Sequence, residues 1–564
     1  MIASGYAACL HTLCKLTKKT LYRARADRNT ADKKIGGRGV SAVTPDGEPT
    51  TLSEVICSNA SLRGGKVAFV DENRQVSFAQ FNGRVNRLCN ALQRLGIRKG
   101  DRVAFLSRNC IEYVELYGVA KSGSLAVPLN WRLAMPELVA VVQDCAPAVL
   151  VVEEGQIAAI DAERPNLADV THFVALGPPR AGWLSYEELL ADAAEDEPEY
   201  CPAPHDIACI TYTSGTTGRP KGVMLRHDAL VENAAVSAAE AMGLSDADVT
   251  LAVMPLFHVG GMWYHLFASF ATGCTTFIRP AFDPADALSA IETNGITNVH
   301  LVPTMLGDLI GQPGTVAAAR SLRLVFYAAS SMPVELLQRS MGVLSHCHFL
   351  QCYGSTEAGM VTALLPSDHE EAVRNSEREH LLLSCGQALR GVQVRIDRDI
   401  GVPDDIGEVL VGGSKIMAGY WGRDDATRAS LSDGWLRTGD LGRIDDEGYL
   451  YIVDRKSDMV ISGGENIFPS EVEQVLYRHP EILEAAVLGV ADARWVEKVV
   501  AAVVLKPGSA LTPGDIIQFV RRHLASYKCP KLVLIMDNLP RSGAGKVLRK
   551  DLRNRFDVSN QTAD

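Results

Sequence analysis

The stretch from Tyr212 to Gly222 concentrates groups that can bind an oligophosphate. Its sequence, YTSGTTGRPKG, follows a strand-like run at 206–211 and holds four Ser or Thr hydroxyls, three glycines and one lysine. Backbone N–H groups left open by glycine, hydroxyl donors and a single cation suit a chain of phosphates. Pro220 precedes Lys221 and Gly222 follows it, whereas a Walker loop has Gly before the lysine and Ser or Thr after it. The stretch therefore predicts a phosphate-binding loop of another kind.

Four more polar motifs follow along the chain, and three residues in them suit nucleotide chemistry. Glu357 can supply a carboxylate to a hard cation that also binds phosphate oxygens. Asp440 can accept hydrogen bonds from two hydroxyl donors. Lys546 is a cation on a glycine-flanked loop and can bring two anions together in a dehydrated site. The motifs are QCYGSTEAG (351–359), DGWLRTGDLG (433–442), DRKSDMVISGGEN (454–466) and PRSGAGKVLR (540–549).

In this order, the motifs resemble those of the adenylate-forming enzymes, which include acyl-CoA synthetases, aryl-CoA ligases, carrier-loading adenylation domains and luciferase. The resemblance covers about Thr51 to Arg555 and favours the acyl-CoA synthetase, or fatty-acid–CoA ligase, branch. It implies ATP, Mg²⁺ and CoA as cofactor and cosubstrates. It also implies that a carboxylate attacks the α-phosphorus of ATP, that pyrophosphate leaves, and that a thiol then attacks the acyl-AMP.

The resemblance assigns roles to individual residues. The phosphate loop closes over the β- and γ-phosphates, Tyr353 stacks on adenine, and Thr356 contacts the α-phosphate. Glu357 and Thr216 hold Mg²⁺, Asp440 and Arg455 bind the ribose hydroxyls, and Lys546 bridges the acid and the α-phosphate. The implied catalytic residues are Lys546, Glu357, Thr216 and Lys221, and the implied ATP-binding residues are Thr213, Ser214, Gly215, Thr216, Thr217, Gly218, Lys221, Tyr353, Gly354, Thr356, Asp440, Arg455 and Lys546.

An acyl pocket is expected along 254–270 and 327–332. No acidic residue occurs between Asp248 and Asp283, so nothing in that wall would neutralise a substrate ammonium, and an apolar acid fits better than an amino acid. His258 resembles the gate that the family places beside the reacting carboxylate, with a hydrogen-bonded core histidine as the alternative. The expected pocket residues are His258, Val259, Gly260, Ala329 and Ser330, and the residues expected along the CoA path are Ser462, Gly463 and Gly464.

Two positions that bear on the second half-reaction depart from the family pattern. Ser457 stands where the hinge between domains is usually Lys or Asp, and Val496 stands where Gly is usual. The first bears on the domain rotation that separates the two half-reactions, and the second bears on a strand near the CoA path. We expect neither to abolish activity.

Composition points to an ordinary globular enzyme. The 564 residues are 47% hydrophobic and 22% charged, with 56 basic and 67 acidic side chains, so a net charge of −11 offers nothing to nucleic acid. The 13 cysteines show no C-x-x-C pair, which favours reduced thiols and a cytoplasmic location. No apolar run reaches the roughly 20 residues that a transmembrane helix needs, although a peripheral membrane contact stays open. Oligomeric state cannot be read from these features.

Periodicity predicts an α/β fold of several units. Helical and strand-like segments alternate up to about Tyr200 and again from Ile207 to about Pro366, and short strands with tight turns follow Gly386. We expect a large N-terminal adenylation domain of two α/β sheet subdomains plus a β-rich subdomain, with a small mobile α+β C-terminal domain. The expected divisions are a basic, disordered tail at 1–45, the large domain at 46–454, and the small domain at 455–564 with its hinge near 454–458. A mitochondrial presequence is the alternative for the tail.

The sequence favours activation of a fatty acid, followed by transfer to CoA. Aryl acids and sterol side-chain acids remain alternatives, as does transfer of the acyl group to a carrier protein. A non-catalytic nucleotide-binding protein is the alternative from another functional class. The motif residues for the first half-reaction are all present, which favours an enzyme.

Overall fold

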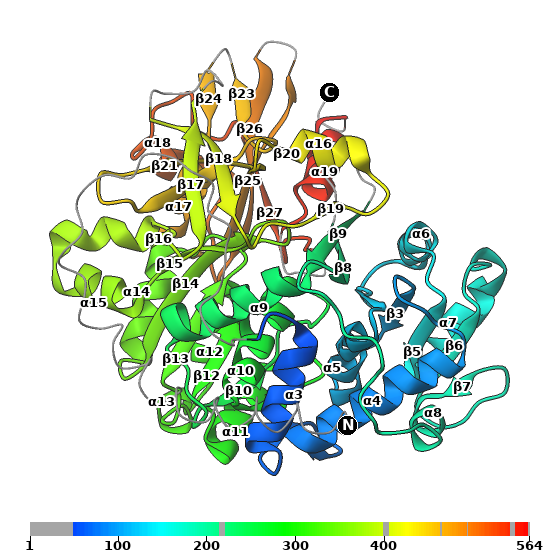
Figure 1. The fold of residues 1–564 in the computed structure, drawn as a ribbon. Coiled ribbons are helices and arrows are strands. Elements are labelled where there is room, and N and C mark those ends of the chain that lie inside the picture. Colours follow the sequence, from blue (N-terminus) through cyan, green and yellow to red (C-terminus); the bar gives the residue numbers. More distant parts are fainter. Residues whose placement is uncertain are drawn as a thin grey trace. The chain divides into compact units, whose positions relative to one another are not determined.

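The computed structural model describes residues 49–213, 220–398, 405–462, 465–492, 495–541 and 547–561. The expected tail at 1–45 lies outside the described residues. Four sheets hold the named strands, two of them of α/β type, one β-rich and one in the C-terminal α+β part, which confirms the predicted fold class (Figure 1). Among the described helices, none combines the length and apolar character that crossing a bilayer requires.

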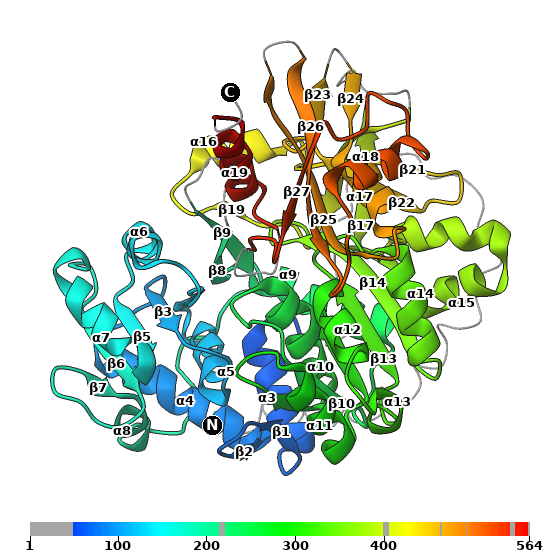
Figure 2. The same cartoon turned by 180° about the vertical axis from the view of Figure 1, so that it is seen from behind.

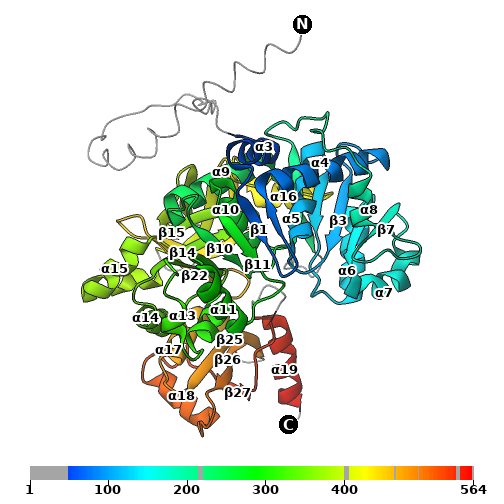
Figure 3. The same cartoon turned by 90° about the horizontal axis from the view of Figure 1, so that it is seen from below.

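Nine strands form the first sheet, whose middle is parallel. β12 and β13 are buried along their whole length, as expected where helices cover both faces of a parallel sheet. Figure 3 shows β1, β10 and β11 together in this sheet. The spatial order is β16 (Gln387–Ala388), β15 (Gly359–Leu364), β14 (His348–Ser355), β13 (Leu324–Ala328), β12 (Asn298–Leu301), β10 (Val249–Ala252), β11 (Thr275–Ile278), β1 (Val67–Val70) and β2 (Gln75–Ser77).

The second sheet has eight strands and corrects the expected division between the two α/β units. Periodicity starts the second unit at Ile207, yet β8 pairs in parallel with β4 of the first unit, and β1 and β2 join the nine-stranded sheet instead. Apolar periodicity marks a buried strand but does not say which sheet the strand joins. The spatial order is β19 (Gly419–Tyr420), β9 (Lys221–Arg226), β8 (Ile207–Thr213), β4 (Leu125–Pro128), β3 (Arg102–Leu106), β5 (Val149–Glu153), β6 (His172–Leu176) and β7 (Leu184–Ser185).

The third sheet is the predicted β-rich part, and its strands are antiparallel. Its last hairpin turns at Asp445 to Gly448, where Asp445 accepts hydrogen bonds from the backbone N–H groups of Glu447 and Tyr449. The strands are β17 (Val392–Asp397), β18 (Gly407–Gly413), β21 (Trp435–Ile444), β20 (Leu431–Ser432) and β22 (Leu450–Arg455).

The C-terminal part has its own sheet and its own core. β25 and β26 form a long antiparallel pair with buried, alanine- and valine-rich sequences, and β27 adds to β26 in parallel (Figure 2). The elements are β23 (Val460–Ser462), β24 (Glu465–Ile467), α17 (Pro469–Tyr477), β25 (Ile482–Asp492), β26 (Val496–Leu505), α18 (Pro513–Arg521), β27 (Leu532–Met536) and α19 (Arg549–Gln561).

Helices of the large domain follow their sequence signals closely where a cap is present. α4 begins after Ser77, whose side chain forms a capping box with Gln80, and its apolar face is buried. The remaining helices are α3 (Leu52–Arg63), α4 (Phe78–Arg94), α5 (Ile111–Tyr117), η1 (Gly118–Ser122), α6 (Met135–Cys145), α7 (Glu154–Glu163), η2 (Arg164–Asn166), α8 (Tyr186–Ala191), α9 (His227–Val236), η3 (Ser237–Met242), η4 (Gly260–Leu266), α10 (Phe267–Thr272), α11 (Pro284–Asn294), α12 (Pro303–Ile310), α13 (Thr315–Ala318), α14 (Val334–Val343), α15 (Pro366–Arg374), η5 (Ser376–Leu383) and α16 (Asp424–Ser430).

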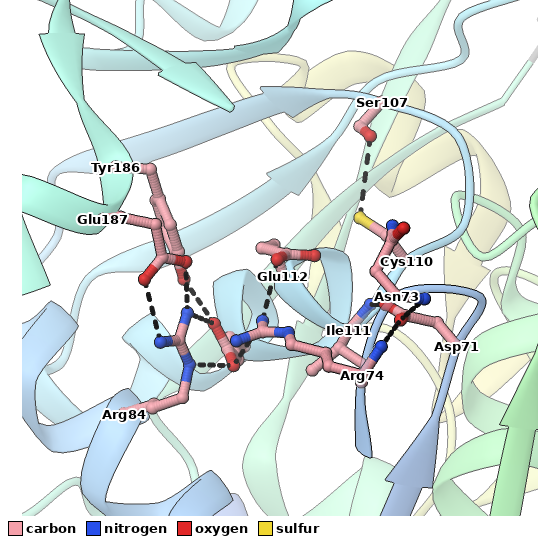
Figure 4. A network of polar contacts seen from close by, with 11 residues as sticks. Asp71, Asn73, Arg74, Arg84, Ser107, Cys110, Ile111, Glu112, Tyr186 and Glu187 are labelled. Atoms are coloured by element: carbon pink, nitrogen blue, oxygen red, sulfur yellow. Dashed lines mark hydrogen bonds and ion pairs between the residues drawn. The ribbon is translucent and has the colours of Figure 1, made fainter. Parts of the chain in front are cut away.

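A network of polar contacts connects three of these helices, and Figure 4 shows Arg84 of α4 beside Tyr186 and Glu187 of α8. Glu115 of α5 has no exposed side-chain surface and accepts from Arg84 of α4 at 2.6 Å and from Tyr186 of α8 at 2.9 Å. Arg74 lies 3.3 Å from the same carboxylate, and Arg84 also pairs with Glu187. Burial raises the pKa of Glu115, while the two arginines lower it. Glu115 and Glu187 each pair with an arginine, which is typical of a structural network.

Candidate nucleotide-binding site

The two ends of the phosphate loop are direct neighbours. Thr213 ends β8, Lys221 begins β9, and the two residues are opposite each other in an antiparallel pair. The loop between them therefore leaves and re-enters one sheet at the same point. Ser214, Gly215, Thr216, Thr217 and Gly218 lie outside the described residues, so their phosphate contacts stay predictions.

A tight turn between β14 and β15 carries the second motif. β14 continues through Tyr353 to Ser355, so the first part of the motif belongs to the strand. A side chain at Gly354 would bring its Cβ within 2.2 Å of the carbonyl oxygen of Gly359, so the close approach of the two strands at this position requires glycine. Thr356 and Glu357 consequently sit in the short turn that joins two antiparallel strands.

Asp440 is the centre of a polar cluster that the sequence predicted in part. Tyr353 donates from Oη to Asp440 Oδ2 at 2.6 Å, and Arg455 Nε lies 3.1 Å from Asp440 Oδ1. Asp440 and Arg455 are opposite each other in the β21–β22 pair, so the sheet register positions both. Burial and the Asp440 charge raise the pKa of Tyr353, which therefore stays a neutral donor. The cluster joins the residues expected at adenine and at the ribose, whereas their contacts with a nucleotide stay predictions.

Tyr420 connects two further predicted residues and was missed from the sequence. Its Oη donates to Glu357 Oε1 at 3.1 Å, and the Nζ atom of Lys221 lies over its ring, 4.9 Å from the ring centroid. Because the Gly419–Tyr420 pair forms only a two-residue strand, periodicity gives no signal for it. Its pairing with β9 brings it to the site.

The donor set around Glu357 fits Mg²⁺. Within the described ranges, Glu357 has no ion pair, and its carboxylate accepts a hydrogen bond from the neutral phenol of Tyr420. A carboxylate whose negative charge is not already neutralised is the ligand that a hard divalent cation prefers. The second predicted ligand, Thr216, belongs to the undescribed part of the phosphate loop.

The predicted acyl wall lies beside the turn of the second motif. His258, Val259 and Gly260 are half-buried and lead into η4, and Ala329 and Ser330 follow β13 and are exposed. Ala328 pairs with Cys352, so Ala329 leaves β13 at the level where β14 reaches Tyr353. Ala329 adopts a left-handed backbone conformation with φ of 75°, a strain that non-glycine residues show mostly at functional positions. Whether these residues bind an acyl group stays a prediction.

His300 lies under this wall and was not singled out from the sequence. Its Nδ1 is 3.2 Å from the carbonyl oxygen of Gly260, and its ring stacks on Phe326 with centroids 4.1 Å apart. Burial lowers the pKa of His300 far below its usual value, so the ring is neutral. A histidine within an apolar strand can be a pocket residue or a core residue, and the sequence alone does not distinguish the two.

The residues expected for CoA and for adenylation chemistry belong to the C-terminal part. Ser462 ends β23 and pairs with Val496, while Gly463, Gly464 and Lys546 lie outside the described residues. Val496 has φ of 72° and is 70% exposed, so the position where the family usually has Gly does adopt a glycine-type conformation. The departure at Val496 thus places a strained residue beside the predicted CoA path.

Arg549 fixes the start of α19 near the expected hinge. Its guanidinium lies 2.7 Å from Glu473 and 3.3 Å from Asp458. Asp454 accepts from the backbone N–H of Ser470 at 2.9 Å, and burial raises its pKa to about 6. The Ser457 hydroxyl lies 3.5 Å from Asp458 Oδ1, at the limit of a hydrogen bond, so this contact adds little to the cluster.

Comparison with known proteins agrees with the motifs. Residues 58–421 match the AMP-binding enzyme family and residues 471–546 match the AMP-binding enzyme C-terminal domain. The chain is 41% identical to an indoleacetate–CoA ligase of Aromatoleum aromaticum, over 89% of this chain and 97% of that protein. It is 36% identical to a fatty acid–[acyl-carrier-protein] ligase of Streptomyces coeruleorubidus, over 90% of this chain and 96% of that protein.

A solved structure extends the likeness to the fold. The crystal structure of ATP-bound MatB from Rhodopseudomonas palustris is similar with a TM-score of 0.81 and 30% identity, covering 90% of this chain and 99% of that one. The family match spans more than half of the chain, and the relatives are matched over nearly their full length. The chain therefore belongs to the AMP-binding enzyme family, in the acyl-CoA synthetase branch of the adenylate-forming enzymes that its motifs predict.

Proposed function

We propose that this enzyme activates an apolar carboxylic acid with ATP to an acyl-AMP, releases pyrophosphate, and transfers the acyl group to CoA. The observation that carries the proposal is the convergence of Lys221, Glu357 and the Asp440 cluster from motifs far apart in the sequence. A cation, an unpaired carboxylate and a diol acceptor together match the phosphates, the metal and the ribose of MgATP.

In the proposed first half-reaction each residue holds one part of the reactants. Lys221 and the phosphate loop hold the pyrophosphate that leaves, and Asp440 with Arg455 holds the ribose. Glu357 and Thr216 hold Mg²⁺, which when bound supplies positive charge to the phosphate oxygens. Lys546 brings the acid carboxylate and the α-phosphate together, where it lowers the repulsion between two anions.

The proposal includes a mobile small domain. Residues 455–564 rotate about the hinge near 454–458, so that Lys546 serves the first half-reaction and the loop at Ser462 lines the CoA path in the second. Support comes from the separate sheet and core of this part of the chain and from its own family match at 471–546. We also place the reaction in the cytoplasm, supported by the described cysteines, all of which are free.

Aryl and arylacetic acids are the substrates we favour among apolar acids. The predicted wall is rich in buried aromatic side chains, including Phe257, Trp263 and Tyr264, and a relative 41% identical is named for indoleacetate. Flat rings pack well against such a surface. Fatty acids with transfer to a carrier protein are the second candidate, favoured by the relative named for that reaction.

A two-stage assay tests the proposal. Pyrophosphate exchange into ATP, without CoA, is measured against indoleacetate, hydroxycinnamates, benzoates and fatty acids of graded length, and thioester formation is then measured with CoA or with an acyl carrier protein. Exchange with aryl acids followed by CoA thioester formation is expected. ATP binding with no exchange for any acid would favour the non-catalytic alternative, and exchange with thioester only on the carrier would favour the second candidate.

A further inference from the structure

A segment at 415–421 connects the phosphate-loop strand with the turn that carries Glu357. Ala418 donates to the carbonyl of Met224 at 2.9 Å, and Trp421 donates to that of Gly222 at 2.7 Å, so the segment follows β9. Met417 donates to the carbonyl of Glu357 at 2.8 Å. The segment thus belongs to the eight-stranded sheet through β19 while its backbone holds a turn of the nine-stranded sheet (Figure 1).

Tyr420 is the residue of this segment that touches both charged side chains. It is only 7% exposed, its ring lies under Lys221 Nζ, and its hydroxyl donates to Glu357. The Tyr420 backbone N–H donates to the Thr427 hydroxyl at 2.9 Å, which holds the main chain from which the ring projects. Lys221 and Glu357 form no ion pair within the described chain, although one tyrosine contacts both.

We propose that Tyr420 is a positioning residue that holds Lys221 and Glu357 apart, so that the cation stays available to phosphate and the carboxylate to Mg²⁺. Without the spacer, the two opposite charges that now contact one side chain would gain energy by pairing directly with each other. A direct pair would have to break before either group could bind its ligand. The inference rests on the proposed function only in that the ligand is MgATP. The role of Tyr420 goes beyond the proposed function.

Two substitutions separate the two contacts. Tyr420→Phe removes the hydroxyl and keeps the ring, so it should release Glu357 alone. Tyr420→Leu removes both the hydroxyl and the aromatic ring, so it should release Lys221 as well as Glu357. Tyr449→Phe is the matched control, because Tyr449 is 6% exposed and donates to the Asp368 carboxylate at 3.1 Å, the same bond at a place remote from the site.

The test measures ATP binding by titration calorimetry, once in EDTA and once with increasing Mg²⁺, together with the thermal midpoint of each unliganded variant. For Tyr420→Phe we expect that the affinity for ATP in EDTA is unchanged. The Mg²⁺ concentration that gives half of the Mg²⁺-dependent increase in ATP affinity should rise about tenfold, which corresponds to the loss of one hydrogen bond to a charged group. Tyr420→Leu should in addition weaken ATP binding in EDTA about tenfold. Tyr449→Phe should lower the thermal midpoint and leave both affinities unchanged.

Wild-type Mg²⁺ dependence in both Tyr420 variants would overturn the inference, as would an equal change in Tyr449→Phe. Because calorimetry needs neither the acid nor CoA, a protein that binds MgATP but activates no acid refutes the proposed function while the Tyr420 comparison still stands. A wild-type chain that does not bind MgATP would overturn both. A Tyr420 variant that fails to fold is replaced by Thr427→Val, which removes the anchor of the Tyr420 backbone and should shift the Mg²⁺ dependence in the same direction.

Discussion

Lys415 is a buried lysine, and replacing it by methionine should stabilise the protein. Its side chain is 3% exposed, and its Nζ has no hydrogen-bond partner within the described chain. Burial lowers the pKa of Lys415 from 10.5 to about 8, although Glu232 and Glu240 act in the opposite direction. At about 1.4 kcal/mol for each pKa unit, holding the charged form near neutral pH costs about 3 kcal/mol. Methionine keeps the apolar stem and removes the charge.

The sign of the pH dependence follows from the same numbers. Between pH 8 and 10.5 the unfolded chain binds more protons at this site than the folded chain, so stability rises with pH in that window and the full cost is present below pH 8. The gain from Lys415→Met should therefore be largest near neutral pH and shrink as pH approaches the unfolded pKa. Urea unfolding followed by tryptophan fluorescence, at about pH 7 and about pH 9.5, measures both.

Lys121 provides the matched control, because it is equally buried but fully partnered. Its Nζ contacts Asn82 and Asn86 at 2.6 and 2.7 Å and Glu197 at 2.6 Å. Lys121→Met leaves these acceptors without their cation and should destabilise the protein by about 3 kcal/mol. The reasoning is refuted if Lys415→Met lowers the urea midpoint as Lys121→Met does, because Lys415 must then have a partner in solution.

Three further changes have predictable directions. Val496→Gly should raise stability by about 1 kcal/mol, since relief of a left-handed valine exceeds the entropy cost of glycine, and a lower thermal midpoint would count against the strain. Glu115→Gln should lower the free energy of unfolding by about 3 kcal/mol, because it removes the buried carboxylate that pairs with the arginines. Glu187→Gln, at the exposed end of the cluster, should lower it by under about 1 kcal/mol. Comparing the urea unfolding midpoints of the two variants tests this difference. Burial lowers the pKa of His265 and His369 to about 4 each, so the unfolded chain binds more protons between pH 6.5 and 4, and stability should fall as pH falls through that window. A thermal midpoint that stays level from about pH 7 to about pH 5 would contradict this.

Local signals in the sequence predicted the elements better than their assembly. Helix α4 is marked by a cap at Ser77 and by an apolar face, and both features are encoded within a few residues. The sheet that β8 joins depends on pairing with β4, far away in the sequence, and no local pattern contains that information. For the same reason the motifs predicted Asp440 and Arg455, which share one hairpin, but missed Tyr420, which reaches the site through a two-residue strand.

The charges of the site come from different sheets, and this explains why its two halves must be held together. Lys221 begins a strand of the eight-stranded sheet, and Glu357 lies in a turn of the nine-stranded sheet. A ligand that binds both residues gains energy only if the two sheets keep one arrangement, and any free movement between them would be lost on binding as entropy. The backbone bonds of 417–421 to both sides fix that arrangement before a ligand arrives. It follows that a substitution in this segment should change ligand affinity more than it changes the stability of either sheet.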